Sequence, residues 1–189
     1  MKIINKTLFI SLALVFLLSS FAFAGYSYKA KKDHLGGDIT PAEAFTMVKK
    51  NSQNTFLVDC RTMPEYQFVG HAKGAYNVPL QFFSTKKIGK KGYVNVNNPN
   101  FGKDLLARFN PETDTLIIFC RSGGRSCGAC NEAVKAGFSD KKVFNIMGGF
   151  EGGKNKNKNS AFYGQRWSGG WRIEGLPWTY KMDKKLMYR

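Results

Sequence analysis

The fold of this chain is decided at LIIFCRSGGRS, Leu116–Ser126. The first half of this stretch belongs to the apolar, β-branched run Thr115–Cys120, which is typical of a buried strand. A cysteine ends the run, and two glycines and two arginines follow it at once. A buried structural cysteine does not require such a loop, whereas a reactive thiol does. Cys120 is therefore the first candidate for a catalytic residue.

Several features around Cys120 would stabilise a thiolate. A free cysteine, with a pKa of about 8.5, is mostly protonated at neutral pH, and only the thiolate is a strong nucleophile. Arg121 and Arg125 supply permanent positive charge. Gly123 and Gly124 allow positive φ angles, so that successive N–H groups can form an anion-binding nest. The predicted anion-binding loop consists of Arg121, Ser122, Gly123, Gly124, Arg125 and Ser126.

Strands and helices alternate around this loop. A helix is predicted from Thr40, because Thr40 is a good N-cap, Pro41 suits the first helical position and Glu43 completes a capping box. Further strands are predicted at 55–60, 76–78 and 141–149, and further helices at 64–68 and 126–137. Ser126 is the expected N-cap of the last helix. This alternation predicts an α/β domain with a mainly parallel sheet and a ligand site where strands end and helices begin.

The first 24 residues have the pattern of a secretory signal peptide. Lys2 and Lys6 precede the apolar run Thr7–Phe21, and Ala22-Phe23-Ala24 is a small-x-small cleavage site. Cleavage predicts an exported, periplasmic protein that keeps no stable membrane span. An uncleaved anchor facing the periplasm is the alternative.

Three other segments lie outside the predicted core. Residues 25–37 are polar and are expected to form a mobile leader, and residues 84–103 a long surface insertion. The domain is expected to span residues 38–152. Residues 153–189 begin with the flexible basic linker GKNKNKN and continue into an aromatic extension. The residues expected to dock this extension on the domain are Trp171, Leu176, Trp178 and Tyr180.

Three motifs together resemble the signatures of rhodanese-fold sulfurtransferases. LVDCRTMPEYQFVGHAKGAYNVPL, residues 57–80, is similar to the first signature, with its Asp-x-Arg and Gly-His-x-x-Gly-Ala. LIIFCRSGGRS resembles the active-site loop, and VFNIMGGFEG, residues 143–152, resembles the closing strand and Gly-Gly. The resemblance covers residues 38–152 in the expected order. It implies a three-layer α/β fold with a parallel sheet of about five strands flanked by helices.

The resemblance also implies a two-step transfer of sulfane sulfur. Cys120 would take the outer sulfur of thiosulfate or a similar small anionic donor, and its persulfide would pass that sulfur to cyanide, a thiol or a protein acceptor. No cofactor is implied. The loop from Cys120 to Arg125 has six residues, as in sulfurtransferases, whereas rhodanese-fold phosphatases and arsenate reductases have one more. A sulfur-relay or binding module loaded by a partner protein is the alternative function, and an arsenate- or phosphate-processing enzyme of the same fold is a less favoured one.

Residues of the first signature have supporting roles by the same resemblance. Asp59 and Arg61 match the Asp-x-Arg pair that braces the region beside the active loop, and His71 matches a hydrogen-bonding fold residue. Glu65 is expected on the surface of a helix. His34 lies in the leader with no recognisable partner, so no metal site is predicted.

The other three cysteines depart from the simplest form of the family. Cys60 stands inside the Asp-x-Arg motif, where an aliphatic residue is usual, and is expected to face the core. Cys127-Gly128-Ala129-Cys130 is a CxxC at the start of a helix, as in dithiol redox proteins. Cys127 is therefore a candidate to resolve an oxidised or persulfidated Cys120, or to pair with Cys130. A thiol redox protein is thus a further alternative.

The charge of the chain is strongly basic. Lys and Arg number 29 against 13 Asp and Glu, a formal net charge of +16. Such a surface attracts small anions or serves solubility. Export makes nucleic acid the poorest of the possible partners.

Overall fold

The computed structural model describes residues 26–87 and 92–189. The predicted signal peptide, residues 1–24, lies outside the described residues. Within the described part, no helix combines the length and the apolar character needed to cross a membrane.

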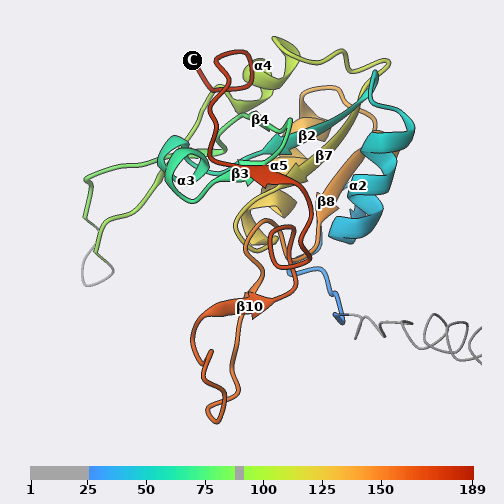
Figure 1. Cartoon of the computed structure of the whole chain (residues 1–189). Coiled ribbons are helices and arrows are strands. Elements are labelled where there is room, and N and C mark those ends of the chain that lie inside the picture. The colour runs from blue at the N-terminus through green and yellow to red at the C-terminus, as the bar shows by residue number, and fades with distance from the viewer. Residues whose placement is uncertain (1–25, 88–91) are drawn as a thin grey trace, which may run out of the picture.

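A five-stranded parallel sheet forms the centre of the fold (Figure 1). The strands are β1 (Gly37–Ile39), β2 (Thr55–Asp59), β4 (Tyr76–Asn77), β7 (Thr115–Phe119) and β8 (Val143–Ile146). Their order is β1-β8-β7-β2-β4, and every pair of neighbours is parallel. The apolar run of β7 suits its central place, because such a strand is covered on both faces. The predicted α/β fold is confirmed.

Helices cover both faces of the sheet and complete three layers. They are α2 (Pro41–Lys50), α3 (Met63–Phe68), α4 (Phe101–Leu106) and α5 (Gly124–Lys135), with a short 3₁₀ turn, η2 (Asp140–Lys142). Ala44 of α2 belongs to the same core cluster as Ile117 of β7. Leu105 of α4 and Ala133 of α5 belong to a second cluster with Ile118. Successive residues of β7 thus supply opposite faces of the sheet.

Capping boxes start α2 and α3. The Glu43 N–H donates to the Thr40 hydroxyl, and the Thr40 N–H donates to the Glu43 carboxylate over 2.7 Å. The predicted start of the first helix is therefore confirmed. Thr62 and Glu65 form the same box at α3. Each box satisfies two N–H groups that a helix start leaves without partners.

Helix α5 begins two residues earlier than predicted. Its N-cap is Gly123, whose φ of 92° lies in the left-handed region, and the helix runs from Gly124. Ser126, the predicted N-cap, lies inside the first turn and is fully buried. The glycine lets the chain turn directly from the loop into the helix, so the first N–H groups of α5 face the loop that begins at Cys120.

Two hairpin arms extend from the domain (Figure 1). One arm is built on the antiparallel pair β5 (Gln81–Phe82) and β6 (Val96–Asn97), and the other on β9 (Gly153–Lys154) and β10 (Arg166–Ser168). A third antiparallel pair, β3 (His71–Ala72) with β11 (Trp178–Thr179), joins the C-terminal extension to the domain. The predicted flexible linker therefore starts as a paired strand, because β10 supplies a partner that composition does not reveal. The predicted insertion 84–103 ends inside the core, where Phe101 of α4 is 2% exposed.

The leader and the C-terminal extension pack against each other. The Tyr28 hydroxyl contacts the Glu174 carboxylate and accepts the Gly170 N–H over 2.9 Å. The predicted mobile leader also ends in β1, the edge strand of the sheet. Trp171 of the extension is buried in the core cluster that contains Ile117. Residues from the leader and the extension therefore meet at Gly148, just after the closing strand β8.

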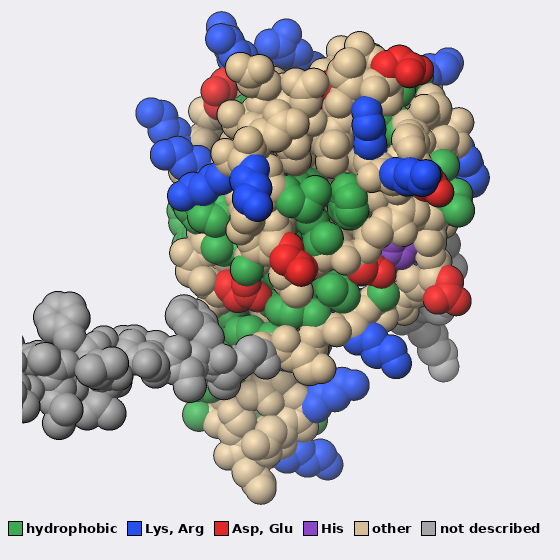
Figure 2. All heavy atoms as spheres, turned by 90° about the vertical axis from the view of Figure 1, so that its right-hand side faces the viewer, with side chains coloured by type: hydrophobic (Ala, Val, Ile, Leu, Met, Phe, Trp, Pro, Cys, Tyr) green, Lys and Arg blue, Asp and Glu red, His purple; other side chains and the backbone are tan. Residues whose placement is uncertain are grey.

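Basic side chains are spread over the side of the molecule where α2 lies. Figure 2 shows Lys and Arg around the margin of this face, with several Asp and Glu side chains among them. Hydrophobic side chains gather near its centre. The positive charge of the chain does not form one continuous patch on this face.

Candidate active site

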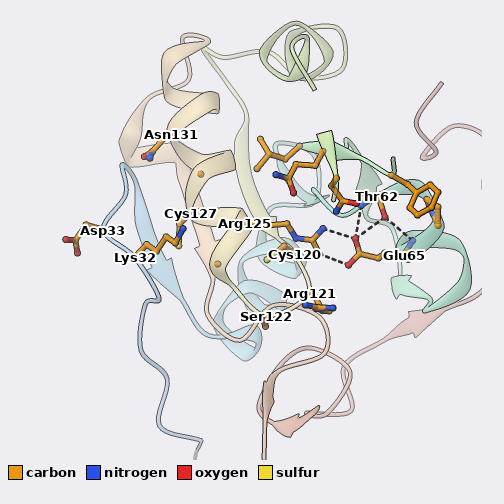
Figure 3. Close-up of a pocket in the computed structure, with 17 residues that line it drawn as sticks. Lys32, Asp33, Thr62, Glu65, Cys120, Arg121, Ser122, Arg125, Cys127 and Asn131 are labelled. Atoms are coloured by element: carbon orange, nitrogen blue, oxygen red, sulfur yellow. Dashed lines mark hydrogen bonds and ion pairs between the residues drawn. The ribbon is translucent and has the colours of Figure 1, made fainter. Parts of the chain in front are cut away.

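Cys120 lies at the carboxyl end of β7, directly before α5 (Figure 3). The residue is 1% exposed, yet it lines an open cleft of about 910 Å³. The Gly123 N–H donates to Cys120 Sγ over 3.2 Å, and the Ser126 hydroxyl oxygen lies 3.5 Å from the same sulfur. The thiol is therefore enclosed by its own loop and is reached from the cleft.

The surroundings of Cys120 stabilise its thiolate. Burial alone would raise the pKa of the thiol. Hydrogen bonds from the Cys60 thiol and from Ser126, together with the positive charge of Arg125, outweigh burial and hold the pKa well below its usual value. The surroundings of Cys120 thus favour the thiolate, which is the form that attacks sulfur.

Ser126 connects this sulfur to a buried polar chain. Its hydroxyl donates to Asn145 Oδ1 over 2.6 Å, and Asn145 Nδ2 donates to Asp38 Oδ1 over 2.7 Å. A hydroxyl carries one proton. The Ser126 proton can therefore turn from Asn145 to Cys120 Sγ when the thiolate forms. Ser126 positions and stabilises the sulfur, and Asn145 is a supporting residue that the sequence motifs did not single out.

Cys60 lies beside Cys120 on the neighbouring strand. Asp59 is paired with Phe119 in the β2–β7 ladder, so the next residues of the two strands, Cys60 and Cys120, continue the register. The Cys60 N–H donates to the Phe119 carbonyl over 2.9 Å. Both cysteines belong to the core cluster on the α5 face of the sheet. The prediction that Cys60 faces the core is confirmed. Its position beside Cys120 was not predicted from the sequence.

Arg125 is held by an acid from another element. Figure 3 shows its guanidinium directed toward Glu65 of α3, and two hydrogen bonds of 2.7 and 2.5 Å join them. Burial alone would raise the pKa of Glu65, but Arg125 and the capping bonds with Thr62 lower it to about 2. Glu65 lies on α3 as expected and is partly exposed, but the sequence did not predict that its carboxylate serves both α3 and the loop.

Three further cations surround the loop. Arg121 lines the cleft. Burial, then the nearby charges of Arg166 and Arg121, lower the pKa of Lys31 against the opposite effect of the Cys120 thiolate. Burial and Arg121 likewise lower the pKa of Arg166. Because these cations repel one another, an anion beside Cys120 would relieve their repulsion. Lys31 was not predicted as a site residue because it belongs to the leader.

The closing Gly-Gly braces the loop from behind. Gly149 has a φ of 61°, and a Cβ at this position would lie 2.4 Å from the Cys120 carbonyl oxygen. The next two N–H groups, of Phe150 and Glu151, donate to the carbonyls of Cys120 and Arg121, each over 2.8 Å. The loop backbone is therefore fixed by a segment that tolerates no side chain at the contact.

Asp59 and Arg61 form a fully buried ion pair. Arg61 Nη2 lies 2.6 Å from Asp59 Oδ2 and donates to the Gly70 carbonyl over 2.7 Å. The guanidinium carbon lies 4.4 Å from the centroid of the Phe150 ring. The pair thus supports the residue that hydrogen-bonds the Cys120 carbonyl, and it stands behind the loop, outside the cleft lining.

The two histidines have structural partners. The His71 ring stacks on Tyr66 with centroids 3.7 Å apart, and its Nδ1 lies 3.1 Å from the Tyr66 carbonyl. Burial lowers the pKa of His71. His34 Nε2 lies 3.0 Å from Asp38 Oδ1. In residues 26–87 and 92–189, no group of three or more His, Cys, Asp or Glu side chains could hold a metal ion.

All four cysteines are free thiols in this structure. The Cys127 thiol lines the cleft and donates to the Gly123 carbonyl over 3.1 Å. Burial raises the pKa of Cys127 and also that of Cys130. The surroundings of both helix cysteines thus favour the protonated thiol, in contrast to those of Cys120.

Comparison with known proteins gives consistent matches. The family model for the rhodanese-like domain matches residues 40–156. The uncharacterized protein RP600 of Rickettsia prowazekii is 33% identical over 144 residues, 76% of this chain and 97% of that protein. Thiosulfate sulfurtransferase 16 of Arabidopsis thaliana is 36% identical over 93 residues, 49% of this chain and 68% of that protein. The crystal structure of Rv0390 from M. tuberculosis has a TM-score of 0.61 at 32% identity, and covers 78% of this chain and 99% of its own.

Proposed function

This chain belongs to the rhodanese-like family, and we propose that it is a sulfurtransferase that carries sulfane sulfur as a persulfide on Cys120. One observation carries the proposal. A buried cysteine, at the floor of an open cleft, has its pKa held well below the usual value by donors of its own six-residue loop and by Cys60. The name of the Arabidopsis relative, a thiosulfate sulfurtransferase, supports the same chemistry.

The first step is attack of the Cys120 thiolate on the outer sulfur of a sulfane donor. With thiosulfate, a new bond forms between Sγ and that sulfur while the bond to the sulfonate sulfur breaks. Sulfite leaves with the electron pair, and Cys120 becomes a persulfide anion. Because the surroundings of Cys120 favour its thiolate, this attack needs no separate base.

The cations around the loop favour an anionic donor. Arg121 lines the cleft, and Lys31 and Arg166 lie near it with mutually repelling charges. A sulfonate bound among these residues would reduce their repulsion and place the outer sulfur toward Sγ. Arg125 is already neutralised by Glu65. Its charge therefore acts mainly on the thiolate and the persulfide.

The second step returns the sulfur to an acceptor. A nucleophile such as cyanide attacks the terminal sulfur, the bond to Sγ breaks, and the Cys120 thiolate leaves. The same donors that stabilise the starting thiolate stabilise this leaving group, because the Gly123 N–H and the Ser126 hydroxyl remain directed toward Sγ.

A sulfur relay loaded by a partner protein is the second candidate function. The cleft is open and is walled on one side by residues of the β5–β6 arm, Gln81, Phe83 and Asn95. Phe83 is 63% exposed. An exposed aromatic side chain at the rim suits contact with another protein better than retention of a small anion.

Intact mass of the reduced protein, before and after thiosulfate, tests the proposal. Wild type is expected to gain one sulfur atom that cyanide removes, and Cys120→Ser is expected to gain none. Cys127→Ser serves as the matched control within the same cleft. A gain of sulfur by Cys120→Ser would overturn the assignment. No gain from thiosulfate, with a gain from a protein persulfide, would select the relay.

A further inference from the structure

Cys60 and Cys120 occupy matching positions at the ends of two adjacent parallel strands. The β2–β7 register pairs Thr55 with Thr115 and continues without a shift to Asp59 and Phe119. Neighbouring strands lie about 4.8 Å apart, and disulfides join Cα atoms roughly 4.4–6.8 Å apart. Both thiols point to the same face of the sheet, and the Cys60 thiol helps to lower the pKa of Cys120. The strand register thus places the two Cα atoms at a spacing that a disulfide can join.

The bonds that form and break in sulfur transfer involve Cys120, and Cys60 acts there only on the pKa of its neighbour. Cys60 is fully buried and lies outside the lining of the cleft, whereas Cys120 is part of that lining. A donor in the cleft therefore reaches Cys120 from the cleft, whereas Cys60 lies next to Cys120 within the core. An aliphatic residue would fill the same volume, but it would neither favour the Cys120 thiolate nor supply a sulfur that can bond to Cys120.

We propose that Cys60 is the resolving thiol of Cys120 and forms a disulfide with it after oxidation. The oxidant is a hydroperoxide. The Cys120 thiolate attacks the outer peroxide oxygen, the O–O bond breaks, and an alkoxide or hydroxide leaves, which gives a sulfenic acid. The Cys60 sulfur then attacks Cys120 Sγ, the S–O bond breaks, and the leaving oxygen departs as water with the Cys60 proton. An external dithiol restores both thiols and is itself oxidised to a disulfide.

The inference assigns this role to Cys60 rather than to the helix cysteines. The Cys127 thiol is engaged with the Gly123 carbonyl. Cys130 lies one helical turn further along α5. Burial and the Cys120 thiolate raise the pKa of Cys60. The second cause is lost once Cys120 is a sulfenic acid, and the Cys60 proton then passes to the leaving oxygen as the sulfur attacks.

The disulfide would protect the active site against irreversible oxidation. A sulfenic acid that is not resolved proceeds with more peroxide to sulfinic and sulfonic acids, which dithiols do not reduce. Cys60 diverts the sulfenic acid into a reducible bond and switches sulfur transfer off until reduction. This inference rests on the proposed function only in taking Cys120 to be a reactive thiolate.

Peptide mapping of the peroxide-treated full chain tests the inference. Reduced wild type, Cys60→Val, Cys60→Ala and Cys127→Ala are each treated with hydrogen peroxide, quenched, and digested without reductant. Wild type and Cys127→Ala are expected to contain a peptide cross-linked through Cys60 and Cys120, and dithiothreitol should restore their thiosulfate loading. Both Cys60 variants are expected to accumulate sulfinic acid at Cys120 and to lose the recoverable fraction of their own starting activity.

Each contrary outcome has its own meaning. A Cys120–Cys127 cross-link in wild type would overturn the inference. So would sulfinic acid at Cys120 in a wild type that loads sulfur normally before treatment, and the proposed function would then stand. A Cys120 that neither loads sulfur nor reacts with peroxide would overturn both.

Discussion

Arg125 and Glu65 form a two-pronged ion pair, with Nη1–Oε2 and Nη2–Oε1 distances of 2.7 and 2.5 Å. Glu65 also closes the capping box of α3 through Thr62. One carboxylate therefore ties the start of α3 to the first turn of α5. The pair fixes the position of a positive charge beside Cys120 without leaving that charge unpaired.

Arg125→Ala is expected to raise the pKa of Cys120, because it removes a charge that favours the thiolate. Alkylation of Cys120 by iodoacetamide near neutral pH should slow, with its pH midpoint moved upward. Arg125→Lys keeps the charge and should retain most of the rate. Peptide mapping separates Cys120 from the other three thiols. An unchanged midpoint in Arg125→Ala would show that the charge does not act on the sulfur.

Glu65 is expected to contribute stability that acid removes. Its folded-state pKa is about 2, below the ordinary value of 4.5. The contribution is therefore complete above about pH 4.5 and is lost as the pH falls toward 2. A shift of this size corresponds to about 3 kcal/mol at most, and partial exposure reduces it. Urea unfolding between pH 2 and 6 should show that the free energy of unfolding of Glu65→Gln falls less steeply with decreasing pH than that of wild type.

Glu132→Gln is the matched control for this pH dependence. Glu132 forms an exposed pair with Lys135, and such pairs contribute little. Its unfolding midpoints should follow wild type at every pH. If Glu65→Gln and Glu132→Gln behaved alike, the ion pair with Arg125 would not stabilise the fold.

Arg61→Met is expected to destabilise the fold by about 3–5 kcal/mol, because it leaves the Asp59 carboxylate buried without its partner. Asp59 and Arg61 are both fully buried. Arg172, whose guanidinium carbon lies 5.8 Å from the same Phe150 ring, provides the control Arg172→Met. Urea unfolding should separate the two variants clearly. Equal stability would contradict the bracing role of the buried pair.

The sequence predicts the sheet and the active loop well because both depend on short-range patterns. The run Thr115–Phe119 is apolar enough to require a central strand, and Cys120 follows it within one loop. The capping box at Thr40 is likewise contained in four residues. Such signals can be recognised in a short stretch of sequence without knowing which distant segments pack against it.

The features that the sequence missed depend on distant segments. Glu65 reaches Arg125 across 60 positions of the chain, and Cys60 contacts Cys120 only through strand register. The leader was expected to be mobile because its composition is polar, yet Tyr28 is held by the far C-terminal extension. Composition describes a segment, whereas these contacts depend on the partner that the fold brings to it.

Gly149→Ala is expected to abolish most sulfur loading by displacing the active loop. Its Cβ would lie 2.4 Å from the Cys120 carbonyl oxygen and 2.8 Å from the Ser122 nitrogen, and both are backbone atoms that cannot turn aside. Gly164→Ala is the control, because Gly164 has a φ of 77° but has space around the added methyl group. Backbone strain alone costs about 1–2 kcal/mol at either site.

The two glycine variants separate strain from contact. Both should lose similar stability through the left-handed backbone, but only Gly149→Ala should lose the donors aimed at Cys120, since its methyl group pushes on the loop itself. Persulfide loading from thiosulfate, measured by intact mass on folded protein, should therefore be near wild type in Gly164→Ala and nearly absent in Gly149→Ala. Equal loading in the two variants would mean that the closing Gly-Gly supports the fold in general and not the geometry of the thiolate.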